Sequence, residues 1–112
     1  MFVTFVIPSI NRISLLKTLD SILNQTNDNW RVIIVFDGIV DVHPSIEEKC
    51  NDHKIILHKV EKQKDRSCVR NIGIQMCTTP WIAFVDDDDT ISSHYTEMIY
   101  QASIKHNKTD CI

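Results

Sequence analysis

The sequence predicts an α/β fold in which helices cover both faces of a parallel sheet. Short apolar runs alternate with segments whose apolar residues recur at helical spacing, and this gives the order β-α-β-α-β-α-β-α. Because parallel strands need long crossover connections, that order favours a parallel sheet. With 43% hydrophobic residues, two glycines and three prolines, the chain has the composition of a packed protein. A length of 112 residues suits one small domain, so we expect residues 1–112 to form a single domain.

The first strand and the first helix are predicted near the N-terminus. Residues 2–7 form a near-continuous apolar run, as expected for a strand buried on both faces, and Pro8 is expected to end it. A helix is predicted over 12–24, where Asn11 or Ser14 can cap it. Its apolar residues form one stripe, as in a helix that packs on a core: Leu15, Leu16, Leu19, Ile22 and Leu23.

The middle of the chain predicts two strands around a short helix. Residues 31–36 are apolar and lead into Asp37-Gly38, a pair typical of turns. A short helix is predicted over 42–51, with Pro44 near its start. Residues 54–60 alternate more clearly in polarity, which is typical of a strand nearer the edge of a sheet.

The last part of the chain predicts a helix over 68–76, a strand over 81–85 and a final helix that ends at about residue 106. Residues 107–110 predict a turn, and 111–112 resemble the opening of another strand. The residues of the final helix region that are expected to face the sheet share helical spacing: Ile91, Tyr95, Met98, Ile99 and Ala102.

Four consecutive aspartates, Asp86 to Asp89, follow the predicted strand over 81–85. Two like charges about 4 Å apart repel by roughly 4 kcal/mol at an effective dielectric constant of about 20, so this run is unfavourable for stability alone. A hard divalent cation relieves the repulsion, because it takes oxygen ligands and also bridges phosphates. The alternative is a solvated acidic turn. Since open α/β sheets bind ligands beyond the carboxyl ends of their strands, the sequence favours a site for a metal and a phosphate.

Other polar residues are predicted to lie at the same edge of the sheet as the aspartates. They are in the segment 8–11 and at Asp37. Asp37 can accept a hydrogen bond from the imide N–H of a base, or it can simply belong to the turn before Gly38. Arg70 can make a forked contact with a phosphate or a base carbonyl, or it can pair with an acid at the surface.

Composition argues against several classes of function. Twelve Lys and Arg against fifteen Asp and Glu give a formal net charge of −3, so nucleic acid is not expected as the main partner. No segment approaches the ~20 apolar residues of a membrane span, and no signal peptide is evident. The four cysteines lack Cys-x-x-Cys spacing and are expected to be reduced thiols, which predicts a cytoplasmic protein.

Five motifs occur in a fixed order: FVIPSINR (5–12), LDSILNQT (19–26), VIIVFDG (32–38), VRNIGI (69–74) and WIAFVDDDD (81–89). Taken together, they resemble the N-terminal, nucleotide-sugar-binding half of an inverting family-two glycosyltransferase, which has the Rossmann-like GT-A fold. Their order and spacing match across nearly the whole chain. The resemblance implies a nucleotide-diphosphate sugar as donor, with a UDP-sugar expected. It also implies Mn²⁺ or Mg²⁺ as cofactor and sugar transfer to an acceptor hydroxyl.

The resemblance also implies roles for individual residues. The residues expected to contact the nucleotide sugar come from four of the five motifs: Pro8, Ser9, Asn11, Asp37, Arg70, Asp86 and Asp87. The first three would line the nucleoside pocket. Asp37 would contact the base, and Arg70 the base or the ribose.

For the metal, the resemblance implies an Asp-x-Asp pair formed by Asp86 and Asp88. Asp88 is the first choice as ligand, with Asp87 or Asp89 assisting. No catalytic residue is assigned, because the general base of an inverting transferase comes from a later segment in this family. The sequence departs from the family at Phe36, where an acid is usual, so that base recognition depends on Asp37 alone.

Three alternatives stay open. Asp86 to Thr90 fit the Asp-x-Asp-x-Thr signature of haloacid-dehalogenase-type phosphatases, in which Asp86 would be the nucleophile. Asp86, Asp88 and Glu97 also fall at the first, third and twelfth positions of an EF-hand-like calcium loop, although Ile91 takes the place of its glycine.

In the third alternative the protein has the glycosyltransferase fold but no catalytic activity. The chain stops at Ile112, where another strand is predicted to open, so the sheet is expected to be truncated. An incomplete sheet exposes an unpaired edge and an apolar face. The protein would then be a catalytically inactive binding module that self-associates as a homo-oligomer.

Overall fold

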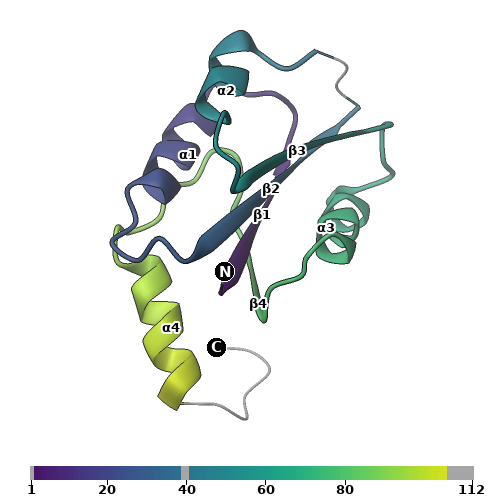
Figure 1. Cartoon of the computed structure of the whole chain (residues 1–112). Helices are drawn as coiled ribbons and strands as arrows, with labels where there is room; N and C mark the ends of the chain where they lie inside the picture. The colour runs from purple at the N-terminus through teal and green to yellow at the C-terminus, as the bar shows by residue number, and fades with distance from the viewer. Residues whose placement is uncertain (1, 39–40, 106–112) are drawn as a thin grey trace.

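The computed structural model describes residues 2–38 and 41–105, and these residues form one four-stranded parallel sheet with four helices (Figure 1). The strand order is β3-β2-β1-β4, which confirms the predicted fold class. The turn and strand predicted over 107–112 lie outside the described residues. The elements follow the predicted order along the chain: β1 (Val3–Ser9), α1 (Leu15–Leu23), β2 (Trp30–Asp37), α2 (Pro44–Lys49), β3 (Ile55–Val60), α3 (Arg66–Gln75), β4 (Trp81–Phe84) and α4 (Tyr95–Lys105).

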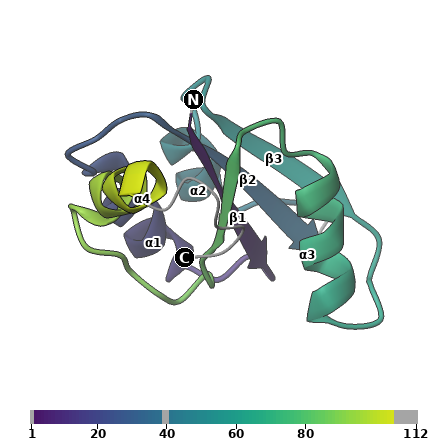
Figure 2. The ribbon, with the colours of Figure 1, turned by 90° about the horizontal axis from the view of Figure 1, so that it is seen from below.

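The helices divide unequally between the two faces of the sheet. Helices α1, α2 and α4 lie on one face, and α3 lies on the other (Figures 1 and 2). Successive residues of a strand point to opposite faces, so β1 and β2 supply apolar side chains to both layers. Ile34 packs in the cluster with α1 and α2, whereas Ile33 and Val35 pack with Val69 of α3. This double burial explains why the sequences of both strands are almost continuously apolar.

Strand β1 continues through Pro8, so the prediction that this proline ends the strand is wrong. Pro8 stays in register with Val35 of β2. The carbonyl of Val6 accepts a hydrogen bond from the Val85 N–H on the β4 side, and residues two apart in a strand point the same way. The Pro8 nitrogen therefore faces the β4 side, beyond Phe84, where β4 has already ended. Because no ladder bond is needed there, the missing N–H of proline carries no penalty.

Helix α4 confirms most of its predicted contacts with the core but not all of them. Ile91, Tyr95 and Ile99 pack against the main cluster. Met98 is 62% exposed and faces solvent, so its predicted contact with the sheet is wrong. Among the residues that the structure describes, no helix is both long enough and apolar enough to cross a membrane.

Strand β4 lies at one end of the sheet order within the described part of the chain, and its last residue, Phe84, is 48% exposed. An edge strand with exposed apolar residues is a site where chains associate. The expected self-association stays a prediction.

Helix α3 approaches the sheet closely at Gly73. A Cβ atom at this position would lie 2.4 Å from Cγ1 of Val6, a residue that is fully buried in β1. We expect Gly73→Ala to lower the free energy of unfolding by about 1–2 kcal/mol, because the strain of overpacking exceeds the helix propensity that alanine adds. Urea denaturation measures the effect. Gln75→Ala, an exposed change in the same helix, serves as the control, and equal stability of the two variants would contradict the packing argument.

The described cysteines, Cys50, Cys68 and Cys77, are free thiols, as predicted. Burial raises the pKa of the Cys50 thiol from 9.0 to about 11. In the unfolded chain the thiol ionises first, between pH 9 and 11, which favours unfolding as the pH rises. We expect the wild-type protein to lose about 1 kcal/mol more stability between pH 8 and pH 10 than Cys50→Ala loses. Urea denaturation at both pH values tests this, with Cys68→Ala as the control, and identical pH dependence in wild type and Cys50→Ala would contradict it.

Candidate functional site

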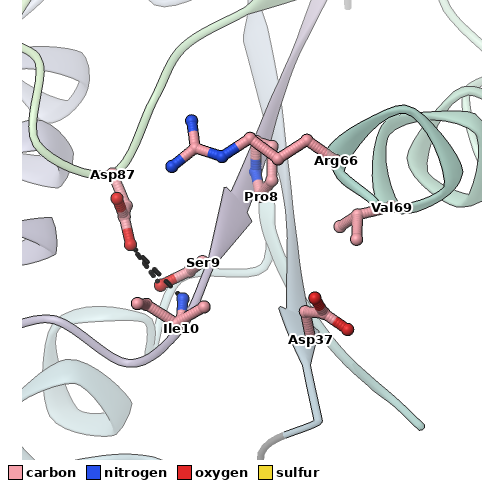
Figure 3. A pocket seen from close by; sticks show the side chains of 7 residues that line it. All are labelled: Pro8, Ser9, Ile10, Asp37, Arg66, Val69 and Asp87. Carbon is pink, nitrogen blue, oxygen red and sulfur yellow. Dashed lines mark hydrogen bonds between the residues drawn. The ribbon is translucent and has the colours of Figure 1, made fainter. Parts of the chain in front are cut away.

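A pocket opens where β1 and β2 end, beside the first turn of α3 (Figure 3). It holds about 260 Å³ of empty space, counting its open mouth. Because that space is open to solvent, these residues form part of a site rather than an enclosed one. Its lining combines acidic, basic and small side chains: Pro8, Ser9, Ile10, Asp37, Arg66, Val69 and Asp87.

The register of the sheet brings these side chains together. Ser9 is the last residue of β1 and lies beside Phe36, so that Asp37 follows at the same edge. The N–H of Asp89 donates a hydrogen bond to the Asp86 carbonyl at 3.1 Å, and the acidic run is therefore a single turn after β4. The polar residues therefore lie together at the carboxyl edge of the sheet, as the sequence predicted.

Asp87 points inward and holds two loops together. Asp87 is only 2% exposed. Its Oδ2 atom accepts a hydrogen bond from the Ser9 hydroxyl at 3.0 Å. The backbone N–H of Ile10 donates to the same oxygen at 3.4 Å (Figure 3). Asp87 lines the pocket, but these bonds use its carboxylate within the protein. Its contact with a nucleotide sugar stays a prediction.

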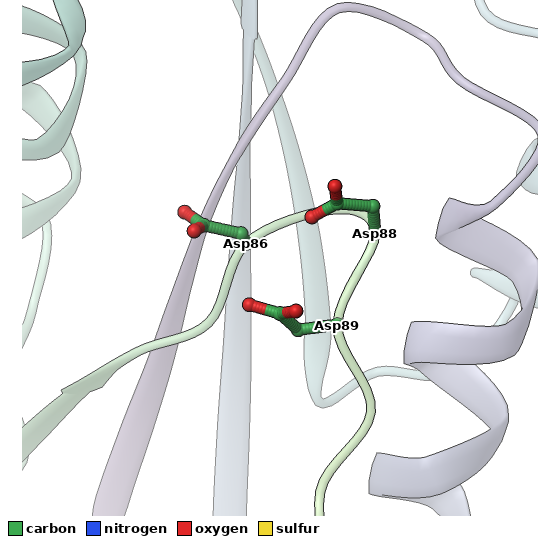
Figure 4. Close-up of side chains that lie close together, drawn as sticks. All are labelled: Asp86, Asp88 and Asp89. Atoms are coloured by element: carbon green, nitrogen blue, oxygen red, sulfur yellow. The ribbon is translucent and has the colours of Figure 1, made fainter.

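The other three aspartates of the turn form a compact cluster, in which Asp86 is half-buried and Asp88 and Asp89 are exposed (Figure 4). One carboxylate oxygen from each of Asp86, Asp88 and Asp89 lies within 4.8 Å of the others. Acceptor-only oxygen atoms at such spacing suit a hard divalent cation. The expected pair of Asp86 and Asp88 is thus brought together, and Asp89, rather than Asp87, is the third carboxylate beside it.

Two arginines of α3 neutralise one of these carboxylates. Oδ1 of Asp86 accepts from Nη1 of Arg66 at 3.4 Å and from Nη2 of Arg70 at 3.2 Å. In this structure Arg70 therefore pairs with an acid, which was the alternative to its contact with a base. Asp88 lies 3.8 Å from the guanidinium of Arg12. The cluster is an acidic site with cationic groups around it.

Arg66 is a site residue that the sequence did not indicate. Helix α3 begins at Arg66, two residues before its predicted start, and this places Arg66 one turn before Arg70 on the same face. The helix begins there because the Asp65 carboxylate accepts a hydrogen bond from the Cys68 N–H at 3.0 Å. That bond lowers the pKa of Asp65. Asp65 therefore serves as a helix cap.

Asp37 lines the pocket, and neighbours already hold its carboxylate. Oδ1 accepts from the backbone N–H of Gln63 at 2.7 Å, and Oδ2 lies 3.5 Å from Nζ of Lys62. The side chain remains only 13% exposed. These contacts fix the carboxylate at the end of β2, where its contact with a base stays a prediction.

Asn11 does not line the pocket. Its backbone has a φ of 67°, in the left-handed region that asparagine tolerates better than most residues. Its side-chain amide donates to the carbonyl of Asp41 at 3.2 Å and accepts from the N–H of His43 at 3.1 Å. Asn11 thus ties the loop after β1 to the start of α2, and it supports the pocket indirectly through Ser9, whose hydroxyl accepts from the Asn11 N–H at 3.1 Å.

The geometry disagrees with an EF-hand-like calcium loop. Asp86 and Asp88 follow a strand, whereas an EF-hand needs a helix on each side of its loop. Glu97, the proposed last ligand, instead accepts hydrogen bonds from Asn27 at 2.8 Å and Gln101 at 2.9 Å. Those two bonds lower the pKa of Glu97.

Fold and site together define a class: a Rossmann-like parallel α/β protein with a charged site at the carboxyl ends of its strands. The chain belongs to glycosyl transferase family 2, because the model of that family matches residues 4–112. This match confirms the resemblance that the five sequence motifs carry. It also leaves no support for the phosphatase alternative.

Two curated relatives show the extent of the similarity. An uncharacterized glycosyltransferase of Rickettsia bellii is 32% identical over 97 residues, which are 86% of this chain and 14% of the relative. Glycosyltransferase GlyA of Streptococcus pneumoniae is 32% identical over 107 residues, which are 93% of this chain and 15% of GlyA. The chain therefore spans about a seventh of the length of these relatives.

A solved structure confirms the GT-A fold. Residues 1–349 of Staphylococcus aureus TarS superpose with a TM-score of 0.85 at 21% identity, over 96% of this chain and 33% of the TarS fragment. The same fragment in complex with UDP gives a TM-score of 0.83, and in complex with UDP-GlcNAc it gives 0.81.

Proposed function

We propose that this chain holds the donor of a glycosyltransferase, a nucleotide-diphosphate sugar, for transfer to an acceptor hydroxyl with inversion. The observation that carries the proposal is the placement of a pocket and a carboxylate cluster side by side at the carboxyl ends of β1, β2 and β4. Membership of glycosyl transferase family 2 supports it. UDP is the proposed nucleotide, because TarS has been crystallised with UDP and with UDP-GlcNAc.

A divalent cation, Mn²⁺ or Mg²⁺, fits the residues present. Asp86, Asp88 and Asp89 would hold it, since each offers a carboxylate oxygen within 4.8 Å of the others. When bound, the cation supplies a Lewis acid that neutralises negative charge on the leaving diphosphate. Arg66 and Arg70 place two further positive groups beside Asp86, where they favour a phosphate.

The remaining pocket residues suit the nucleoside end of the donor. Pro8 and Ser9 form a wall at the end of β1, and Asp37 places an acceptor at the end of β2. A carboxylate acceptor favours a base with an imide N–H, such as uracil. The general base would come from a later segment, as the family resemblance implies.

Calorimetric titration with UDP and CDP, each with and without Mn²⁺, tests the proposal. We expect UDP to bind more tightly with Mn²⁺ than without it, because the cation would offset the negative charge of both the carboxylates and the diphosphate. We expect CDP to bind more weakly than UDP, because cytosine has no imide N–H for Asp37. Binding that is equal with and without Mn²⁺ would contradict the metal site, and equal binding of UDP and CDP would contradict the role of Asp37.

A further inference from the structure

One face of α1 carries a line of polar side chains that follows the acidic loop. Ser14, Thr18, Ser21 and Gln25 are spaced by four, three and four residues, which places them on one side of the helix and its ends. Each of them contacts the segment that runs from the acidic turn to α4. This face is separate from the apolar stripe with which α1 packs on the sheet.

The first two contacts hold the acidic turn itself. The Ser14 hydroxyl donates to the backbone carbonyl of Asp87 at 2.9 Å, and the Thr18 hydroxyl donates to the carbonyl of Asp89 at 2.6 Å. Thr18 is fully buried. Ser14 occupies the N-cap position of α1 without capping it, so its hydroxyl serves the neighbouring loop instead of its own helix.

The next contacts hold the segment between the turn and α4. The Ser21 hydroxyl accepts from the N–H of Ile91 at 3.2 Å. The Gln25 amide donates to the carbonyl of Ser92 at 2.6 Å and accepts from the Thr96 N–H at 2.8 Å. Gln25 and Thr96 are both buried, so these bonds are shielded from water.

These contacts bear on the site because the acidic turn is irregular. Residues 86–94 belong to no strand or helix, so their backbone groups need partners from elsewhere. The three clustered carboxylates repel one another and push the turn open. The backbone carbonyls of Asp87 and Asp89 are held by α1, and they alternate along the chain with Asp86 and Asp88. Holding these carbonyls therefore fixes the spacing of the Asp86 and Asp88 carboxylates.

We propose that Ser14, Thr18, Ser21 and Gln25 are positioning residues that set the geometry of the carboxylate cluster for its cation and diphosphate. They touch no ligand and act through the backbone of the acidic turn. The inference rests on the proposed function for the identity of the ligand. The contacts by which α1 holds the acidic turn do not depend on any ligand.

Thr18 offers the sharpest test, because valine has the same shape without the hydroxyl. We expect Thr18→Val to weaken UDP binding in the presence of Mn²⁺ by about tenfold, the size of one lost hydrogen bond, while UDP binding without Mn²⁺ stays unchanged. Thr18→Ser keeps the hydroxyl and is expected to bind within about twofold of wild type. Hydrogen exchange of the peptide over 87–93 is expected to be faster in the valine variant and unchanged in the serine variant.

Thr4→Val is the matched control. Thr4 is also fully buried, and its hydroxyl lies 2.6 Å from that of Thr79, at the opposite end of β1 from the site. If Thr4→Val weakens UDP binding with Mn²⁺ as much as Thr18→Val does, the effect is one of general stability and the proposal is overturned. Unchanged binding, or unchanged exchange over 87–93, in Thr18→Val overturns it too. Absence of UDP binding in the wild type would refute the proposed function alone, and the exchange rates would still decide whether α1 holds the turn.

Discussion

Asp86→Ala is expected to weaken UDP binding in the presence of Mn²⁺ by at least about 100-fold, the largest effect of any single change at the site. The substitution removes a carboxylate of the proposed cation site and the acid that Arg66 and Arg70 share. Without Mn²⁺, UDP binding is expected to become no weaker, because both guanidinium groups are then free to meet the diphosphate. Calorimetric titration in the two conditions separates the two effects.

Asp20→Ala is the control for this prediction. Asp20 is an aspartate of α1 whose exposed carboxylate pairs with Lys49, far along the chain from the acidic turn. Loss of a surface ion pair changes stability by about 1 kcal/mol or less, so binding should be the same as in wild type. If Asp86→Ala and Asp20→Ala bound UDP and Mn²⁺ equally well, the carboxylate cluster would not be the cation site.

Asp87→Ala is expected to have the largest effect on stability, a loss of about 3 kcal/mol in the free energy of unfolding. Alanine removes the acceptor of the buried Ser9 hydroxyl and of the part-buried Ile10 N–H. Asp87→Asn keeps the shape and one acceptor oxygen, so its expected loss is only about 1 kcal/mol. Urea denaturation of both variants provides the measurement.

Asp89→Ala is the matched comparison for the stability of Asp87→Ala, because it removes an exposed carboxylate from the same turn. We expect Asp89→Ala to be at least as stable as wild type in the absence of a cation, since it relieves repulsion within the cluster. Equal destabilisation by both alanine variants would show that Asp87 has no special role in holding the loops.

The sequence predicted the sheet and its functional edge because both follow from strong signals. The runs at 2–7 and 31–36 are apolar on both faces, which only a central parallel strand requires. Once the strands are parallel, their carboxyl ends must meet, so Ser9, Asp37 and the aspartates had to gather at one edge. Five motifs in order were enough to indicate the family, which the family model confirms.

The different roles of Asp86 to Asp89 could not be predicted from the sequence of the acidic run. Four identical residues give no sign that Asp87 turns inward, because its direction depends on a turn whose partners, Ser9 and Ile10, are more than 75 residues away in sequence. Arg66 was missed for a different reason. The helix was predicted to begin at residue 68, whereas the Asp65 cap starts it at Arg66. Asn11 matched a family motif, yet its amide serves the backbone at Asp41 and His43.

The shared pairing of Asp86 with two arginines has a consequence for how cation and nucleotide affect each other's binding. If a cation takes the Asp86 carboxylate, Arg66 and Arg70 lose their anion, and the pyrophosphate is the group that can replace it. Binding of either ligand then favours binding of the other. By thermodynamic linkage, metal affinity must rise with nucleotide concentration as much as nucleotide affinity rises with metal, so the two should join and leave the protein cooperatively.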